Sequence, residues 1–115
     1  MDNRLFFSAT QRNSHAIGDV LSSFLLSSGS VLEIGSGSGE HGVTFQKRFA
    51  HLTWQTSDPE ENHRKSIKSW IEHEGLITKM PDPIDIDVEK RPWPISTKLR
   101  SSLQCIICIN MIHIS

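Results

Sequence analysis

The stretch "VLEIGSGSGEHG", residues 31–42, decides the fold, because it places four glycines directly behind a short apolar run. The run is too short for a helix and too apolar for a loop, so it predicts a strand that is buried on both faces. Glycines in alternate positions after a strand are typical of loops that approach a ligand closely. The stretch therefore predicts a strand, a ligand-binding loop and a helix that begins near Glu40.

The rest of the chain alternates between amphipathic and apolar segments. Apolar residues recur with helical spacing behind Ser14 as N-cap, behind Glu40, and behind Asp58 with Pro59 as the first helical residue. Alternating strands and helices predict an α/β fold, with a parallel sheet covered by helices on both faces. The strands expected in this fold are residues 31–35, 52–57, 84–88 and 105–114.

Length and charge restrict the kind of protein. A chain of 115 residues fits one domain, and 12 Lys and Arg against 13 Asp and Glu give no basic surface for nucleic acid or anionic lipid. The N-terminus has neither the basic start nor the apolar run of a leader or membrane span, and two cysteines suit a reducing compartment. We expect a cytoplasmic protein, with the nucleus left open.

The glycine loop admits two cofactors. Gly37, Gly39 and Gly42 spell G-x-G-x-x-G, and Asp58 follows Gly39 by 19 residues, which is close to the spacing of an NAD-binding fingerprint. Against NAD, the strand already ends at Gly35. The strand also carries Glu33 at a position that should be buried, where a carboxylate needs a cationic or multiply donating partner.

Aligned from Glu33 as Glu33-x-Gly35-x-Gly37-x-Gly39, "VLEIGSGSG" resembles the first motif of class I S-adenosylmethionine (SAM)-dependent methyltransferases. The resemblance implies a loop beneath the methionine part of SAM, formed by Gly35, Ser36, Gly37 and Gly39. Glu33 would then organise the loop and the ammonium group of the cofactor.

Later acids match the same family in order. By resemblance, Asp58 accepts hydrogen bonds from both ribose hydroxyls, and Asp87 meets the adenine amino group. Asn110 and Met111 stand where the fourth strand of the family opens toward the transferred methyl group. The resemblance therefore favours SAM over NAD.

More narrowly, "QRNSHAI", "VLEIGSGSGEHG", "LTWQTSDP" and "CINMIHIS" together resemble an uncharacterised methyltransferase-like family of bacteria and animals, classed as a domain of unknown function. Arg12 and Asn13, ahead of the first predicted helix, match the "RN" of that family and are candidates for closing over the cofactor. His113 is the candidate catalytic residue, since an imidazole can accept a proton from a nucleophile. Methyl transfer from a sulfonium, however, depends mostly on alignment and desolvation.

A metal site is not expected. Cys105 and Cys108 lie in one apolar strand, where residues three apart face opposite sides of the sheet, and a tetrahedral zinc site needs more ligands than His113 adds. Buried structural thiols are the better interpretation.

The resemblance also implies a sheet with strand order 3-2-1-4-5-7-6, and the chain ends at Ser115, after the fourth strand. We therefore expect residues 1–115 to form one partial domain, the N-terminal part of a Rossmann-like fold with strands 3-2-1-4. It would keep a partial SAM site and be weak or inactive alone. The alternatives are an inactive isoform that acts as an interaction protein, self-associating through its exposed fourth strand, and an NAD-binding Rossmann domain. The sequence does not identify the methyl acceptor.

Overall fold

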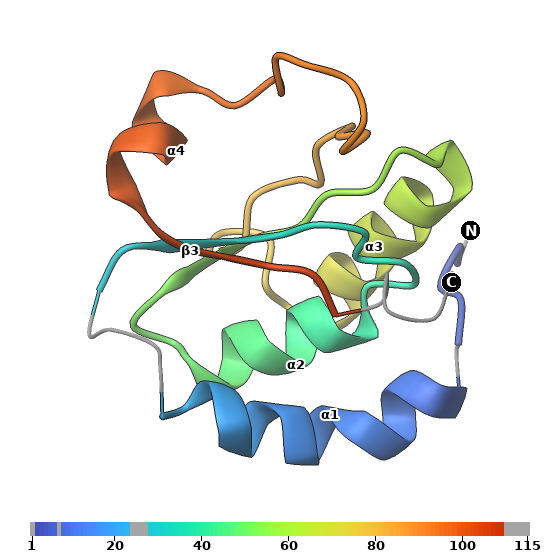
Figure 1. Ribbon diagram of the computed structural model, residues 1–115. Coiled ribbons are helices and arrows are strands. Elements are labelled where there is room, and N and C mark those ends of the chain that lie inside the picture. Colours follow the sequence, from blue (N-terminus) through green and yellow to red (C-terminus); the bar gives the residue numbers. More distant parts are fainter. Residues whose placement is uncertain (1, 7, 24–27, 110–115) are drawn as a thin grey trace.

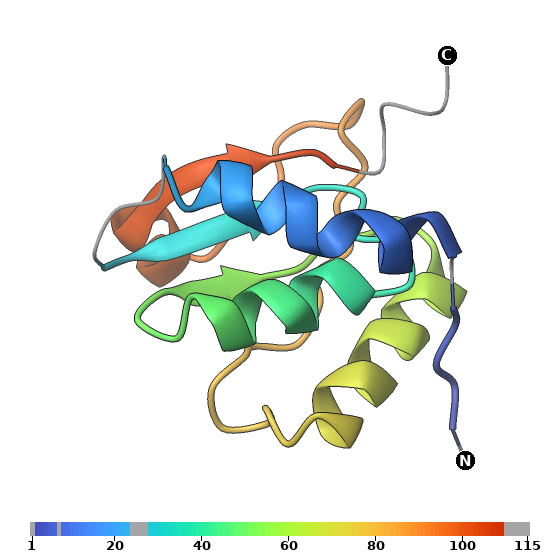
Figure 2. The ribbon, with the colours of Figure 1, turned by 90° about the horizontal axis from the view of Figure 1, so that it is seen from below.

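The computed structural model describes residues 2–6, 8–23 and 28–109, and residues 8–14 through their backbone only. Figure 1 shows the strands crossing the middle of the molecule, with α1 and α2 on one side and α4 on the other. Viewed from below, α1 and α2 lie side by side, and α3 lies next to α2 (Figure 2). The elements in chain order are α1 (Ser8–Leu21), β1 (Ser30–Glu33), α2 (Glu40–Arg48), β2 (Thr53–Gln55), α3 (Glu61–His73), α4 (Thr97–Ser102) and β3 (Leu103–Ile107).

The sheet is parallel, and its strand order is β2-β1-β3. An isolated parallel bridge between Ser57 and Ile84 places the segment after α3 beside the end of β2. The predicted order 3-2-1-4 counts strands along the chain, so the bridge at Ile84 takes the third position and β3 takes the fourth. With that numbering the order agrees, and the α/β fold with a parallel sheet is confirmed.

The segment 84–88 is not a strand, so that prediction was wrong. The backbone of Ile84 forms two hydrogen bonds with the residues that follow β2: its amide donates to the carbonyl of Thr56, and its carbonyl accepts from the amide of Asp58. Beyond it, the Asp87 side chain accepts from the amide of Glu89, and a local turn replaces the ladder. An Asp side chain that bonds nearby amides competes with strand pairing in this way.

Strand β1 is buried on both faces, as predicted. Val31 packs on the side of α2 and α3, with Phe45 and Trp54, whereas Leu32 packs on the opposite side with Ile86. Because successive side chains of a strand point to opposite faces, Glu33 lies on the same side as Val31, under α2. The central strand therefore carries its acid into the larger of the two cores.

The first helix begins earlier than predicted. It starts at Ser8, so Ser14 is not an N-cap, and Arg12 and Asn13 lie within α1 rather than ahead of it. Ala9, Gln11 and Arg12 are good helix formers and extend the helix toward the N-terminus. An N-cap preference alone did not outweigh this propensity.

Two further helix boundaries differ from the prediction. Helix α3 starts at Glu61 rather than Pro59, because the Asp58 carboxylate accepts from the amide of Glu60 and forms a turn first. The six-residue α4 was not predicted; it is capped by Ser96, whose hydroxyl accepts from the amide of Leu99. A helix of only six residues leaves little periodicity to detect.

Strand β3 alternates between half-buried and exposed residues, and Ile106 is 50% exposed. Continuous burial was predicted for this apolar segment, but within residues 103–109 only β1 pairs with it. The rest of the predicted strand, residues 110–114, lies outside the described residues. In the described part of the chain, no helix has both the length and the apolar character needed to cross a membrane.

Candidate functional site

The glycine loop lies where β1 ends and α2 begins. Gly35, Gly37 and Gly39 have φ angles of 63°, 62° and 96°, a backbone region that other residues rarely adopt. Gly39 is the N-cap residue of α2, so the loop delivers backbone amides to the positive end of a helix dipole. A β-carbon on Gly39 would lie 2.9 Å from the Cα of Ile67 in α3. The loop is thus packed directly against α3.

Asp58 joins this loop to the end of β2. It is 4% exposed, and its Oδ2 accepts from the amide of Gly37 at 2.9 Å. Its Oδ1 accepts from the amide of Glu60 at 2.9 Å and lies 3.1 Å from Nδ1 of His63. The carboxylate therefore holds the glycine loop and the start of α3 in one place.

Glu33 is fully buried beneath the loop. Its Oε1 accepts from the indole Nε1 of Trp54 at 3.1 Å, and its Oε2 is buried without a hydrogen-bond partner among the described residues. Burial raises the pKa of Glu33 to about 7, and hydrogen bonding from the side chains of Trp54 and Ser36 offsets only part of that effect. The sequence predicted that this acid needs donors, and one of them is the indole of Trp54.

Hydroxyl groups brace the loop. Ser57 donates to the carbonyl of Glu33 at 2.7 Å, and its own amide donates to the hydroxyl of Ser36 at 3.1 Å. From α3, the Ser66 hydroxyl donates to the carbonyl of Ser38 at 2.6 Å. Ser66 in turn accepts from the amide of Leu5 at 2.8 Å, so the N-terminal segment, residues 2–6, is linked to the loop.

Sequence reasoning missed Trp54, Ser57, His63 and Ser66. A signal existed for Ser57, which precedes Asp58 at the end of a strand, where parallel sheets collect their ligand-binding residues. No sequence signal pointed to Ser66, because it lies in the middle of a helix. Its role depends on how α3 packs against the loop.

Six of the predicted cofactor residues lie together in this region: Glu33, Gly35, Ser36, Gly37, Gly39 and Asp58. Asp87 is half-buried and accepts from the amide of Glu89, within its own turn. Arg12 and Asn13 lie on α1, described through their backbone only. Asn110, Met111 and His113 lie outside the described residues.

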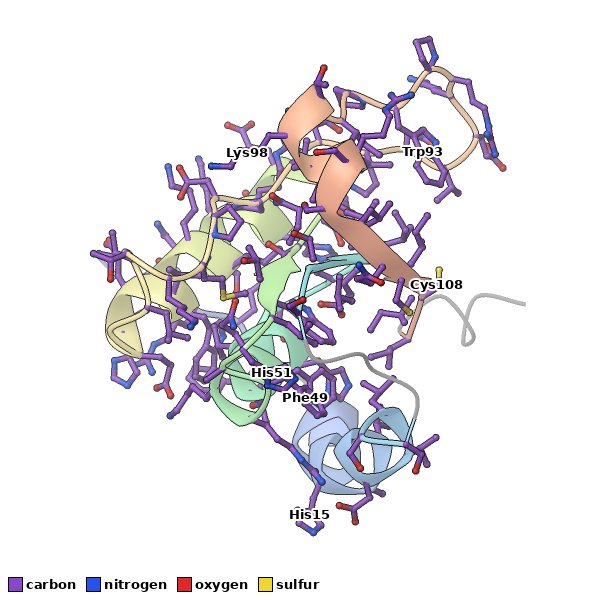
Figure 3. All side chains as sticks on the ribbon, turned by 90° about the vertical axis from the view of Figure 1, so that its left-hand side faces the viewer. His15, Phe49, His51, Trp93, Lys98 and Cys108 are labelled. Atoms are coloured by element: carbon purple, nitrogen blue, oxygen red, sulfur yellow. The ribbon has the colours of Figure 1, made fainter. Side chains whose placement is uncertain are left out.

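Two groupings of metal-binding residue types occur near the sheet. Asp58, Glu60 and His63 bring their ligand atoms within 4.8 Å of one another, but Nδ1 of His63 already lies 3.1 Å from Oδ1 of Asp58 and 3.4 Å from Oε2 of Glu60. Burial raises the pKa values of the Cys105 and Cys108 thiols. Cys108 is exposed, at the end of β3 (Figure 3), so the expectation that both thiols are buried was wrong.

Solved structures of methyltransferases share the fold of this chain. A candidate SAM-dependent methyltransferase from Methanococcus maripaludis matches with a TM-score of 0.69 and 14% identity, over 90% of this chain and 47% of that one. A SAM-dependent methyltransferase from Geobacter sulfurreducens, in complex with S-adenosyl-L-homocysteine, matches with a TM-score of 0.55 and 21% identity, over 75% and 31%. Coclaurine N-methyltransferase, bound to N-methylheliamine and S-adenosyl-L-homocysteine, matches with a TM-score of 0.60 and 10% identity, over 79% and 33%.

These similarities confirm the Rossmann-like methyltransferase fold over the part that the chain covers. The chain spans less than half the length of each of the three proteins. A family model described as a protein of unknown function matches residues 4–115, which is nearly the whole chain. The glycine loop, the strand order and this match agree, and the chain belongs to the DUF938 family of proteins of unknown function.

Proposed function

We propose that this chain is the cofactor-binding part of a SAM-dependent methyltransferase. One observation carries the proposal: the amide of Gly37, in a loop of three left-handed glycines, donates to Asp58 at the end of the neighbouring strand. Ligands of open α/β sheets bind at this edge, beyond the carboxyl ends of the strands. The fold of the similar methyltransferases supports the same cofactor.

The residues present fit the chemical groups of SAM. The positive end of the α2 dipole suits a carboxylate, and the amides of Gly37, Gly39 and Glu40 shape the loop by donating to other groups of the protein. Glu33 has a buried oxygen without a partner, which suits the nearby ammonium group directly or through a water molecule. A carboxylate has roughly four acceptor positions; on Oδ2 of Asp58 the amide of Gly37 uses one, which leaves one for a ribose hydroxyl.

When bound, SAM supplies an electrophilic methyl group on a sulfonium. The residues of this chain would bind and orient it: the loop holds the amino-acid end, Asp58 the ribose and Asp87 the adenine amino group. Arg12 and Asn13 on α1 are proposed to close the site. Asn110 and Met111 are proposed to face the methyl group, and His113 to accept the acceptor's proton. Because this transfer depends on alignment and on excluding water, positioning is the main contribution of the chain.

A second candidate function is binding to other protein chains through β3. Ile106 is half exposed, and in the described structure β3 has a strand on one side only. An apolar strand with an open edge is a template for pairing with another strand. We propose self-association at this edge as the alternative to catalysis, and we assign no methyl acceptor.

Calorimetric titration of the monodisperse protein with SAM, S-adenosyl-L-homocysteine and NAD tests the proposal. We expect binding of the two sulfur compounds and weaker or no binding of NAD. The variant Asp58→Asn should weaken SAM binding by about 10- to 100-fold, because hydrogen bonds to a charged group contribute about 1.5–3 kcal/mol. Asp82→Asn, at an exposed acid, is the control and should bind like the wild type. Tighter binding of NAD, or no binding of any of the three, would overturn the proposal.

A further inference from the structure

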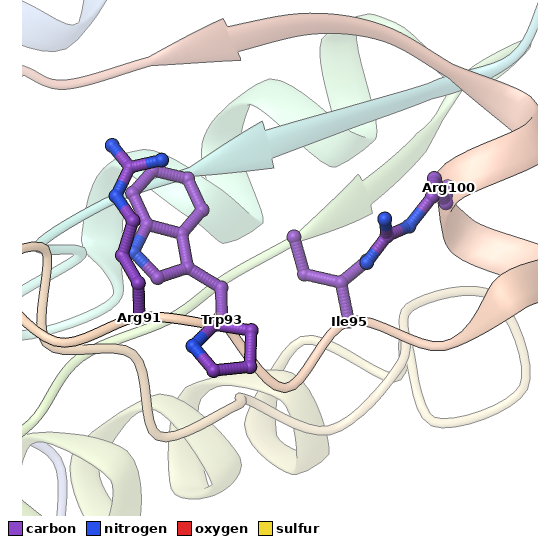
Figure 4. Close-up of a pocket in the computed structure, with 5 residues that line it drawn as sticks. Arg91, Trp93, Ile95 and Arg100 are labelled. Atoms are coloured by element: carbon purple, nitrogen blue, oxygen red, sulfur yellow. The ribbon is translucent and has the colours of Figure 1, made fainter.

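A cavity lies on the side of the sheet that carries α4, apart from the glycine loop. It has a volume of about 530 Å³ and is lined by Arg91, Pro92, Trp93, Ile95 and Arg100 (Figure 4). In Figure 4, Arg91 and Trp93 form one side of this cavity, with Ile95 and Arg100 on the other. Its volume is within the range of small-molecule sites, and none of its lining residues belongs to the proposed cofactor set.

The cavity carries two arginines without acidic partners. Among the described residues, no carboxylate pairs with Arg91 or Arg100, and both side chains are exposed. The other arginines with described side chains each pair with an aspartate: Arg4 with Asp2, Arg48 with Asp19, and Arg64 with Asp85. In a chain with a formal charge of −1, two unpaired guanidinium groups around one cavity form a local site for negative charge.

The Trp93 ring forms part of the wall of the cavity, and its indole N–H is closed to solvent beside Arg91. The indole N–H groups of Trp54 and Trp70 donate to Glu33 and to the carbonyl of Leu5. The indole N–H of Trp93 is buried and has no acceptor among the described residues. Such donors are rare in folded proteins, and this one lies beside Arg91, whose guanidinium carbon is 5.1 Å from the centroid of the Trp93 ring.

We propose that this cavity binds a small organic anion with a flat apolar body and one carboxylate or phosphate group. The indole ring and Ile95 pack against the apolar body, since aromatic and aliphatic walls are the usual lining of such sites. Arg91 and Arg100 hold the anionic group, because the guanidinium fork matches both carboxylate and phosphate.

Binding is tested with 2-naphthoate and 1-naphthyl phosphate, which separate carboxylate from phosphate recognition, and with neutral 2-naphthamide as a ligand of similar shape. The readout is the indole N–H resonance in ¹H–¹⁵N NMR spectra of the full chain. Trp54 serves as the internal control, because its indole is buried against Glu33. Arg91→Gln and Arg100→Gln remove the cations, and Lys98→Gln removes the same charge from an exposed position on α4 (Figure 3).

We expect at least one of the anions to shift the Trp93 resonance and to leave that of Trp54 in place. Binding of that anion should weaken by about tenfold or more in each arginine variant, and 2-naphthamide should bind about tenfold more weakly than 2-naphthoate if the carboxylate is preferred. Lys98→Gln should bind like the wild type.

Three results would overturn the proposal. One is equal binding of the amide and both anions, and another is an equal loss in Lys98→Gln and the arginine variants. The third is the absence of any Trp93 shift up to the solubility limit of both anions, whether light scattering shows the chain as a monomer or as an assembly. An unshifted Trp54 resonance in every variant shows that the fold is intact, so a loss of binding then reflects the cavity. SAM is absent from all samples, and the result is therefore independent of the proposed cofactor site.

Discussion

Replacing Glu33 with Gln should change how the stability of the protein depends on pH. The pKa of Glu33 is raised from 4.5 to about 7 by burial, so the folded state binds a proton that the unfolded state has released between these pH values. A raised pKa means that stability is highest below pH 4.5 and is lost as pH rises toward 7, where the loss levels off. The full difference corresponds to about 3 kcal/mol, at 1.36 kcal/mol for each pH unit.

Urea denaturation at pH 5 and pH 8 measures this effect. Wild type should lose about 2–3 kcal/mol from this group between the two pH values, whereas Glu33→Gln has no ionisable group there. The difference in unfolding free energy between the variant and wild type should therefore move in favour of the variant by that amount at pH 8. Other titrating groups cancel in this comparison, because both proteins contain them.

Glu72→Gln is the matched control, because Glu72 is an exposed glutamate on α3. Its difference from wild type should be nearly the same at pH 5 and pH 8. If Glu33→Gln behaves like this control, then Glu33 is ionised normally in the folded protein, and the reasoning from its burial and its unpartnered Oε2 is refuted.

Three further substitutions test the packing described above. Gly39→Ala should lower the free energy of unfolding by about 2–3 kcal/mol in urea denaturation, because φ is 96° and the new β-carbon meets the α3 backbone. Gly75→Ala, where φ is 69° and the β-carbon has open space, should lower it by about 1 kcal/mol. Equal losses would contradict the close approach of the glycine loop to α3. Ser66→Ala removes two hydrogen bonds and should speed amide exchange in the N-terminal segment, with unchanged exchange there arguing against the link to the loop. Ile106→Lys should reduce self-association in light scattering more than Ile77→Lys, which alters another exposed isoleucine; equal effects would point away from β3.

The glycine loop and the end of β2 could be predicted because local chemistry determines them. Only glycine adopts the left-handed conformation easily at positions 35, 37 and 39, and an acid at the end of a parallel strand lies at the ligand-binding edge. Glu33 could be recognised as an unusual acid in a buried strand. Its contact with Trp54 could not, because that pair joins neighbouring strands whose register the sequence does not specify.

Two of the wrong predictions share a different cause. Segment 84–88 has the alternation of a strand, yet the Asp87 side chain forms a local turn instead. Similarly, Asp58 was predicted to cap a helix at Pro59, but it folds the next residues into a turn and α3 begins at Glu61. In both places a short polar side chain competes with the backbone pattern, and periodicity does not measure that competition.

The hydrogen bonds from Leu5 through Ser66 to Ser38 have a practical consequence for work with this protein. An affinity tag joined ahead of Asp2 would lie next to a segment that Ser66 links to the glycine loop. If the loop binds SAM as proposed, tagged and untagged protein should differ in SAM affinity even though the tag contacts no proposed site residue. Titrations of this chain are therefore best made after the tag is removed.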